Sequence, residues 1–377
     1  MKRFLIVLMV LLAAPALVYA QVEPIDLVNQ VDLDNYRHNL DDLLYAHDGD
    51  NRGVNGPEHD LARNNIEATF TSLGLDTYLH PFDYRGKTYY NVVGVMEGQV
   101  TPDQQYIIGA HYDSVDNPGA DDNGSGVAGM MEMARIFTQY DFEATIIFIS
   151  FDREEQGLWG SKAYASEHRD DDIRGMISAD MIAYTAGGGT CKIYGRTASN
   201  SIKYPLADAV ERYSNGLIPE IKGTFDASDH APFEWEGKPA CLFIEGDWTI
   251  NPCYHRQCDS VDTPDYIDYD FAWQMVRSAT GYLAEAAGLI SDTRCADMKK
   301  FAARCRGRGK IVAKAKMRNT NHNGQTVTFG IDNIEHFDVV IKGKKAKLRK
   351  CCYNGPHTVS IVDPANCVDP VEVGCPD

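Results

Sequence analysis

The sequence predicts an α/β fold in which a mixed, mostly parallel sheet is flanked by helices on both faces, followed by a small C-terminal β domain. Between residues 90 and 287, segments typical of strands alternate with segments typical of helices. Residues 144–151 (ATIIFISF) are apolar on both faces, as expected of a central buried strand. Beyond residue 290, short strand-like runs are separated by Asn, Gly and Pro, which favours a β-sandwich.

Helical signals come first in the chain. Residues 31–75 are predicted to be helical, with Asp34 as one helix cap and a second helix that starts at Glu58 and stops before Gly74. The other expected elements of the α/β part are strands at 90–96, 106–109, 144–151, 175–180 and 241–245, and helices at 126–140, 204–213 and 271–287. The expected strands of the small domain are 310–318, 325–331, 339–341 and 358–362.

The first twenty residues resemble a secretory signal peptide. Lys2 and Arg3 precede an apolar run, and small residues occupy the cleavage positions up to Ala20, so that Gln21 is the expected mature start. The run is short for a membrane span, and no later segment is long enough either. We therefore expect a secreted or periplasmic protein without a transmembrane span; the alternative is that the segment is retained as an anchor.

The charge changes sign near residue 290. Residues 21–290 carry 18 basic and 45 acidic side chains (net −27), and residues 291–377 carry 16 basic and 9 acidic ones (net +7). This change predicts a boundary there. The expected parts are a signal peptide (1–20), a mature N-terminal segment (21–35), a large acidic domain (36–290) and a basic, disulfide-bonded β domain (291–377).

The ten cysteines suit an oxidising compartment. Six lie in the C-terminal part, where disulfides would offset a small core: Cys295, Cys305, Cys351, Cys352, Cys367 and Cys375. A zinc knuckle is the weaker alternative, because the chain contains no C-x-x-C pair. Cys253 and Cys258 bracket a histidine and are expected to bridge, whereas the other pairings stay open.

Five residues in short, distinctive contexts suggest a metal centre. They are His111 in GAHYDS, Asp122 in GADDNGSG, Glu155 in DREEQG, Asp180 in SADMI and His255 in CYHRQC. Two imidazoles and three carboxylates are ligands that zinc accepts. If one carboxylate is shared, each of two metals receives three ligands and keeps an open position, as in hydrolases whose metals lie roughly 3.5–4 Å apart.

Several of these residues follow predicted strands, where an open α/β sheet places its ligands. A metal-binding imidazole usually donates its other N–H to a carboxylate, and Asp113 is placed to accept from His111. Glu154 and Glu155 come directly after the buried strand. Because neighbouring side chains of an extended chain point in opposite directions, one carboxylate can face a metal and the other a reacting water.

Nucleophilic catalysis is not supported by the sequence. Ser228-Asp229-His230 contains the residue types of a serine hydrolase, but three consecutive residues cannot form the relay, and no G-x-S-x-G motif is present. The cysteines have no Cys–His nucleophile context. We interpret residues 228–230 as a structural turn or as a segment beside the metal site.

At this point the sequence resembles the twenty-eighth metallopeptidase family, the secreted bacterial aminopeptidases with two co-catalytic zinc ions. The likeness covers about residues 36–290 and rests on the five segments in their order and spacing. It implies a zinc aminopeptidase-like fold. It also implies that His111 and Asp180 bind one zinc, that Glu155 and His255 bind the other, and that Asp122 bridges them.

The resemblance further implies roles for two other residues. Glu154 would be the general base, and Tyr254 would donate a hydrogen bond to the oxyanion. The expected activity is removal of N-terminal residues from peptides with a free N-terminus. The alternatives are a carboxypeptidase or dipeptidase on the same scaffold, a glutaminyl cyclase, and a non-catalytic binding protein.

The expected partners follow from this interpretation. We expect peptide substrates, a monomer, and no nucleic acid. The basic run at 342–350 has two interpretations. In the first it is a docking surface, for an anionic surface or for the acidic catalytic domain. In the second it is an exposed strand edge, where lysines discourage pairing with another strand.

Overall fold

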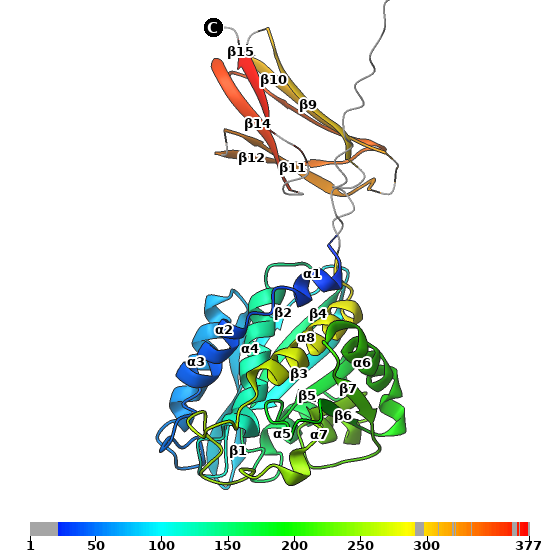
Figure 1. Cartoon of the computed structure of the whole chain (residues 1–377). Coiled ribbons are helices and arrows are strands. Elements are labelled where there is room, and N and C mark those ends of the chain that lie inside the picture. Colours follow the sequence, from blue (N-terminus) through cyan, green and yellow to red (C-terminus); the bar gives the residue numbers. More distant parts are fainter. Residues whose placement is uncertain are drawn as a thin grey trace, which may run out of the picture. The chain divides into compact units, whose positions relative to one another are not determined.

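The computed structural model describes residues 22–290 and 298–375, except for 308, 319, 321, 333, 364–367 and 369. The predicted signal peptide lies outside these residues, as do Cys295 and Cys367. The chain divides into two compact units, with the division between Ile290 and Ser291 (Figure 1). We call residues 23–290 the large unit and residues 298–375 the small unit. Within the described ranges, no helix is both long and apolar enough to cross a membrane.

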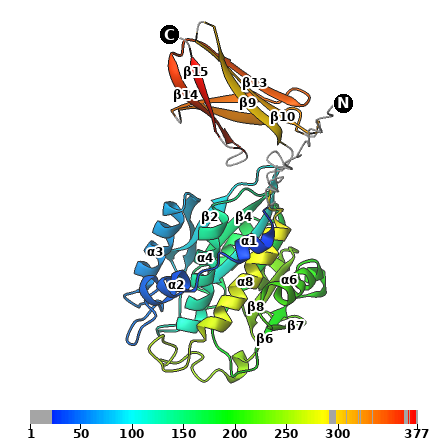
Figure 2. The ribbon, with the colours of Figure 1, turned by 45° about the horizontal axis from the view of Figure 1, so that its top comes forward.

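The large unit is built on an eight-stranded sheet. Its strands are β1 (Asp76–Tyr84), β2 (Lys87–Met96), β3 (Thr101–His111), β4 (Ala144–Phe151), β5 (Asp172–Ala179), β6 (Thr190–Tyr194), β7 (Ile218–Ile221) and β8 (Ala240–Glu245). They lie in the order β1-β2-β4-β3-β5-β8-β6-β7. Of these strands, Figure 2 labels β2 and β4 and, farther along the sheet, β8, β6 and β7. The central strands β4, β3, β5 and β8 are parallel, while β2 and β6 run antiparallel to their central neighbours. The prediction of a mixed, mostly parallel sheet is confirmed.

Helices cover both faces of this sheet (Figure 1). They are α1 (Pro24–Val28), α2 (Leu33–Arg37), α3 (His59–Ser72), α4 (Gly126–Phe137), α5 (Trp159–Glu167), α6 (Asn200–Tyr213), α7 (His230–Trp235) and α8 (Tyr269–Ala286). Consecutive residues of a strand point to opposite faces. Accordingly, Ile108 packs against α4 and α8, whereas Ile107 joins Tyr164 of α5 and Phe233 of α7 in a cluster on the other face.

Two local predictions in the N-terminal region are wrong. Residues 44–58 form no helix between the π-helical turn His38–Leu43 and α3, because three glycines and Pro57 favour turns there. The cap of α2 is Asp32 rather than Asp34: its side chain accepts from the backbone N–H groups of Asp34 and Asn35 at 2.8 and 3.2 Å.

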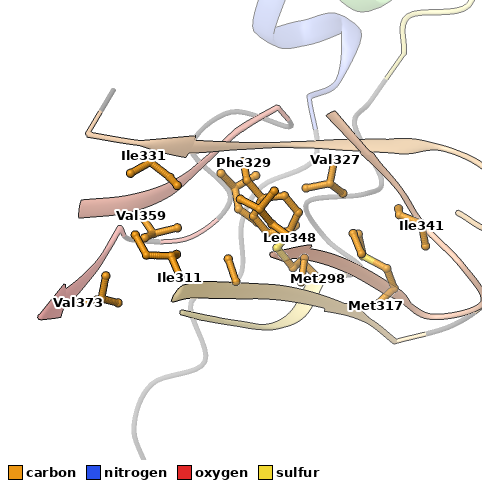
Figure 3. Close-up of a cluster of buried hydrophobic side chains, with 14 of the residues drawn as sticks. Met298, Ile311, Met317, Val327, Phe329, Ile331, Ile341, Leu348, Val359 and Val373 are labelled. Carbon is orange, nitrogen blue, oxygen red and sulfur yellow. The ribbon is translucent and has the colours of Figure 1, made fainter. Parts of the chain in front are cut away.

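The small unit contains two antiparallel sheets that enclose a shared apolar core (Figure 3). Its strands are β9 (Met298–Arg306), β10 (Lys310–Met317), β11 (Thr326–Ile331), β12 (Glu335–Val340), β13 (Lys345–Lys350), β14 (Gly355–Asp363) and β15 (Val371–Cys375). The sheet orders are β13-β10-β9 and β12-β11-β14-β15. Phe329 and Leu348 approach one another from opposite sheets in the core (Figure 3), and the Cys305–Cys375 disulfide joins β9 to β15. Because β13 is the outermost strand of its sheet, the basic run at 342–350 contains an edge strand, as one of its two interpretations predicted.

Candidate metal centre

Three of the predicted ligands lie at the carboxyl ends of neighbouring strands. His111 is the last residue of β3, Glu155 lies in the turn after β4, and Asp180 directly follows β5. Because β4, β3 and β5 are adjacent and parallel, these ends meet at one edge of the sheet.

The other two predicted ligands come from loops that are held firmly. Asp122 lies in the segment Ala120–Ser125 before α4, and its backbone N–H donates to the buried carboxylate of Asp259 at 3.1 Å. His255 lies between Cys253 and Cys258, which form a disulfide. The expected bridge between these cysteines is confirmed, and it limits the freedom of the loop that carries the imidazole.

The five side chains form two groups of potential metal ligands that share Asp122. One group is His111, Asp122 and Asp180, and the other is Asp122, Glu155 and His255. The His111 Nε2 atom lies 3.3 Å from Asp122 Oδ1 and 3.5 Å from Asp180 Oδ1. The His255 Nε2 atom lies 3.1 Å from Asp122 Oδ2 and 3.2 Å from Glu155 Oε2.

This donor set fits a pair of cations. Each Nε2 atom faces oxygens of two carboxylates, although one N–H can satisfy only one of them. The Nδ1 atom of His111 donates to the backbone carbonyl of Asp113 at 3.0 Å, which leaves Nε2 free to act as a ligand. The Oε1 atom of Glu155 is buried and has no hydrogen-bond partner in the described structure. A cation in each group would satisfy these atoms together.

The electrostatics of the group also reflect crowded carboxylates. Burial raises the pKa of Glu155 to about 7. Hydrogen bonds with Asp122 and Glu155 raise the pKa of His255 to about 10. Burial alone would raise the pKa of Asp122, but the hydrogen bonds of His111 and His255 outweigh it and hold this pKa well below its usual range. The five residues thus concentrate negative charge around the shared carboxylate.

Asp113, the predicted carboxylate partner of His111, makes different hydrogen bonds from those expected. The Asp113 carboxylate lies 3.7 Å from the imidazole Nδ1, beyond hydrogen-bonding distance, and only the Asp113 carbonyl accepts from the ring. The carboxylate instead accepts from the backbone N–H groups of Glu154 and Glu155 at 3.1 and 3.4 Å. Asp113 therefore fixes the turn that carries both glutamates.

The expected extended conformation of Glu154 and Glu155 is wrong. The chain leaves β4 at Phe151 and turns, with Arg153 at a φ of +63° and a hydrogen bond from Gly157 N–H to the Glu154 carbonyl at 2.8 Å. The two side chains still separate. Glu155 joins a ligand group, while Glu154 lines the same pocket outside both groups.

The segment 228–230 lies beside the metal centre, as one interpretation predicted. The hydroxyl of Ser228 donates to Asp180 Oδ2 at 2.7 Å. Asp229 is fully buried, neither of its oxygens has a hydrogen-bond partner among the described residues, and burial raises its pKa to about 7. Burial lowers the pKa of His230 to about 4, so this ring is neutral and is no proton relay at neutral pH.

Sequence reasoning missed the apolar wall of this pocket. The lining residues other than the ligands and the catalytic candidates are Met181, Phe225, Ala227, Leu242, Ile244 and Trp248. Tyr254 also lines the pocket, with its ring stacked on His255 at a centroid distance of 3.9 Å. The sequence offered little signal for this wall, because Leu242 and Ile244 belong to β8, which carries no ligand candidate, and only Met181 directly follows one.

A buried arginine was missed as well. Arg52 is fully buried, and its guanidinium donates to the carbonyls of Leu44, Tyr112 and Gly119 at 3.0, 2.9 and 2.6 Å, and also to that of Pro118. Tyr112 follows His111, and Gly119 precedes the segment that carries Asp122. Arg52 therefore ties together the two loops that bear these ligands, from a region whose sequence reads only as turns.

Comparison with known proteins decides the family. The sequence model of peptidase family M28 matches residues 91–282, about half of the chain. The chain belongs to peptidase family M28. All five ligand candidates, from His111 to His255, lie within the matched residues.

Individual relatives are peptidases by name, in agreement with this assignment. The chain is 32% identical to aminopeptidase YwaD of Bacillus subtilis over 191 residues, which are 48% of this chain and 41% of the relative. It is 27% identical to leucine aminopeptidase 1 of Paracoccidioides brasiliensis (strain Pb03) over 246 residues, covering 59% of this chain and 61% of that protein. The chain thus spans less than two thirds of the length of these relatives.

A solved structure supports the fold. The aminopeptidase from Aneurinibacillus sp. strain AM-1 superposes with a TM-score of 0.61 at 20% identity, covering 71% of this chain and 97% of that one. At this identity the similarity establishes that the chain shares the fold of that aminopeptidase, as the sequence predicted.

Proposed function

We propose that this M28 peptidase is an aminopeptidase that removes apolar N-terminal residues from peptides. It would use two zinc ions bound in its own pocket. The observation that carries the proposal is the pair of ligand groups sharing Asp122, with Glu154 in the same pocket. His111, Asp122 and Asp180 would hold one ion, and Asp122, Glu155 and His255 the other. The names of the relatives, which are aminopeptidases, support the reaction.

The chain's own residues then carry out proton transfer. Two bound zinc ions would supply Lewis acidity, which makes a water more acidic and stabilises negative charge on a carbonyl oxygen. Glu154 accepts the proton of the attacking water and returns it to the leaving amine. Its backbone N–H is held by Asp113 at 3.1 Å, which keeps the carboxylate at a fixed place beside the ligand groups. Tyr254 donates to the developing oxyanion.

Two features select the substrate. The carboxylates of Glu154, Glu155 and Asp180 surround the pocket and complement a positively charged α-amine. Beyond them, Phe225, Ile244, Trp248 and their apolar neighbours form a wall that suits a side chain such as that of Leu, Met or Phe. A carboxypeptidase would instead need a cation for the substrate's terminal carboxylate, and the described lining contains no lysine or arginine.

We also propose that the protein is exported as a monomer, with residues 1–20 as a signal peptide. The two disulfides of the described structure support an oxidising compartment, because such bonds persist outside the cytosol.

The experiment is a panel of aminoacyl reporters and short peptides. We expect hydrolysis of Leu, Met and Phe reporters to exceed that of Asp and Lys reporters by about tenfold or more, the scale of apolar side-chain burial. A chelator should abolish the activity, and added Zn²⁺ should restore it. N-acetylated peptides should resist hydrolysis, while peptides amidated at the C-terminus should not.

The reverse pattern would contradict the proposal. Cleavage of N-acetylated peptides together with resistance of amidated ones would identify a carboxypeptidase. Release of ammonia from N-terminal glutamine without peptide cleavage would identify a glutaminyl cyclase. Zinc binding without turnover of any substrate would identify a binding protein.

A further inference from the structure

The exposed side of the three-stranded sheet in the small unit carries a groove of about 550 Å³ that the proposed peptidase chemistry does not use. Eight of its eleven lining residues are lysines or arginines, and the other three are Ala302, Ala303 and Val312. We call the eight cations, which come from β9, β10 and β13, the basic face. No acidic and no aromatic residue is among the described residues that line the groove.

The basic face follows from the alternation of its strands. In β10, Ile311, Ala313 and Ala315 are buried in the core, and the intervening lysines, such as Lys314, point to the other side. In β13, Ala346 and Leu348 are likewise buried between exposed basic residues. The core therefore fixes the cations on one side of the sheet, so that they form a surface rather than a scattered set.

These cations face one another without counter-charges. Lys314 is paired with Lys347 across the strands, and Lys310 is paired with Arg306. Like charges that lie directly opposite each other destabilise a sheet. In the part of the chain that the structure describes, no carboxylate forms an ion pair with any of the eight. The charge of Arg349, followed by those of Lys314 and Arg306, lowers the pKa of Lys347.

Two acidic residues of the small unit lie on its other sheet and already have partners. Asp338 of β12 accepts from the hydroxyl of Thr328 at 2.7 Å, and Glu372 of β15 accepts from that of Thr358 at 2.6 Å. Both belong to the four-stranded sheet. The two sheets thus segregate charge of opposite sign, and the repulsion on the basic face persists in the folded unit.

The geometry of the basic face restricts its partner. Side chains two residues apart on a strand repeat at about 6.6–6.8 Å, and adjacent strands lie about 4.8 Å apart. This spacing gives a dense array of cations along a hollow. Single-stranded nucleic acids need aromatic rings on which bases stack, and membrane-binding surfaces commonly insert apolar side chains. The groove lining offers neither, and a hollow suits a narrow polymer better than a flat membrane.

We propose that the basic face binds a linear anionic polysaccharide, whose sulfate or carboxylate groups supply the missing counter-charges. Arg304, Arg306 and Arg349 provide planar guanidinium groups that match such oxyanions in a bidentate manner, while the lysines act as point charges. The interaction would hold the protein at an acidic extracellular matrix while leaving the pocket of the large unit free to hydrolyse peptides.

The test compares two variants of the full-length protein with equal loss of charge. The face variant carries Lys314→Gln, Lys347→Gln and Arg349→Gln. Binding is measured by surface plasmon resonance on immobilised heparin and on polygalacturonate over a series of salt concentrations. We expect the dissociation constant of the face variant to rise about tenfold or more, and the slope of log Kd against log salt to fall by about two. Its melting temperature should equal or exceed that of the wild type, because repulsion is relieved.

The control variant carries Lys87→Gln, Arg169→Gln and Lys299→Gln, three exposed cations outside the groove. It should keep the affinity of the wild type, and both variants should hydrolyse peptides at the normal rate. The proposal is overturned if both variants lose affinity equally, since net charge alone would then explain binding. It is also overturned if the wild type binds neither polysaccharide, or binds duplex DNA or phosphatidylglycerol vesicles more tightly than both.

Discussion

The two units use charged residues in opposite ways. Residues 21–290 have a net charge of −27, and several of their carboxylates are buried around the pocket, among them Asp121, Asp122, Asp229 and Asp259. Residues 291–377 have a net charge of +7, and the cations of the small unit that line the groove form a surface on one sheet. The effect of a buried charge depends on the neighbours it contacts, whereas the effect of exposed charges depends on how many of them share a surface.

This difference determines how each unit responds to change. A buried carboxylate interacts strongly with its neighbours, and removing one partner leaves the others unsatisfied. An exposed cation is screened by salt and can be replaced at small cost to the fold. We therefore expect single substitutions to abolish the function of the large unit, while the small unit loses its function only when several cations are removed together.

The largest effect should come from Asp122→Ala. Asp122 belongs to both ligand groups, so that its loss removes one ligand from each. We expect zinc content, measured by plasma mass spectrometry after dialysis, to fall well below two ions per chain, and peptide hydrolysis to become undetectable. The matched control is Asp208→Ala on an exposed position of α6, which should keep both. Full zinc content in Asp122→Ala would refute the shared-ligand assignment.

Glu154→Gln should separate chemistry from metal binding. Glu154 lies in the pocket outside both ligand groups, so its amide analogue should retain zinc while kcat falls by about two to four orders of magnitude, the scale of general-base loss. The control is Glu211→Gln on the surface of α6. Near-normal turnover of zinc-loaded Glu154→Gln would remove Glu154 from the mechanism.

Much of the fold could be predicted because hydrophobic patterns report burial directly. All eight residues of β4 are buried, as its unbroken apolar run indicated. The ligand candidates were found for a related reason, because each lies in a compact motif next to a strand, in a loop rich in glycine, or between two cysteines. Where a pattern has a single structural interpretation, as the apolar run of β4 does, the sequence was sufficient to predict the element.

Other elements were missed because two signals overlap in them. In β9 (MKKFAARCR), small or apolar residues are interrupted by cations, and this density of charge conceals the strand. Helix α5 is short, and its apolar residues are few. The role of Asp113 could not be predicted either. Its carboxylate reaches the Glu154 turn only because β3 and β4 are neighbours in the folded sheet.

Arg52→Met should lower stability more than a typical substitution. It leaves buried carbonyls of Leu44, Tyr112 and Gly119 without donors, each at a cost of about 1–3 kcal/mol. We expect the free energy of unfolding to fall by about 3 kcal/mol or more, and the melting temperature of the large unit by about 6 °C or more. Calorimetry of Arg52→Met and of the exposed control Arg169→Met measures the two melting temperatures for comparison. A melting temperature equal to that of the control would show that the guanidinium does not stabilise the loops.

The two disulfides give the most direct comparison of the units. The Cys253–Cys258 loop spans a sequence separation of 5, and the Cys305–Cys375 loop one of 70. Loop-closure entropy therefore assigns about 2 kcal/mol of stability to the first and about 4 kcal/mol to the second. Stability alone would rank the bond of the small unit as the more important one.

Activity should rank them in the opposite order. Replacing both Cys253 and Cys258 by Ser frees the loop that carries His255, so we expect zinc affinity to fall about 10–100-fold, as when the support of a metal ligand is lost. Replacing Cys305 and Cys375 should lower the melting temperature of the small unit and leave kcat/KM on a short peptide unchanged. Zinc titration, calorimetry and peptide hydrolysis on both double variants decide the matter. If the second variant loses peptide hydrolysis while the large unit remains folded and zinc-loaded, the small unit contributes to catalysis and the division of labour between the units is wrong.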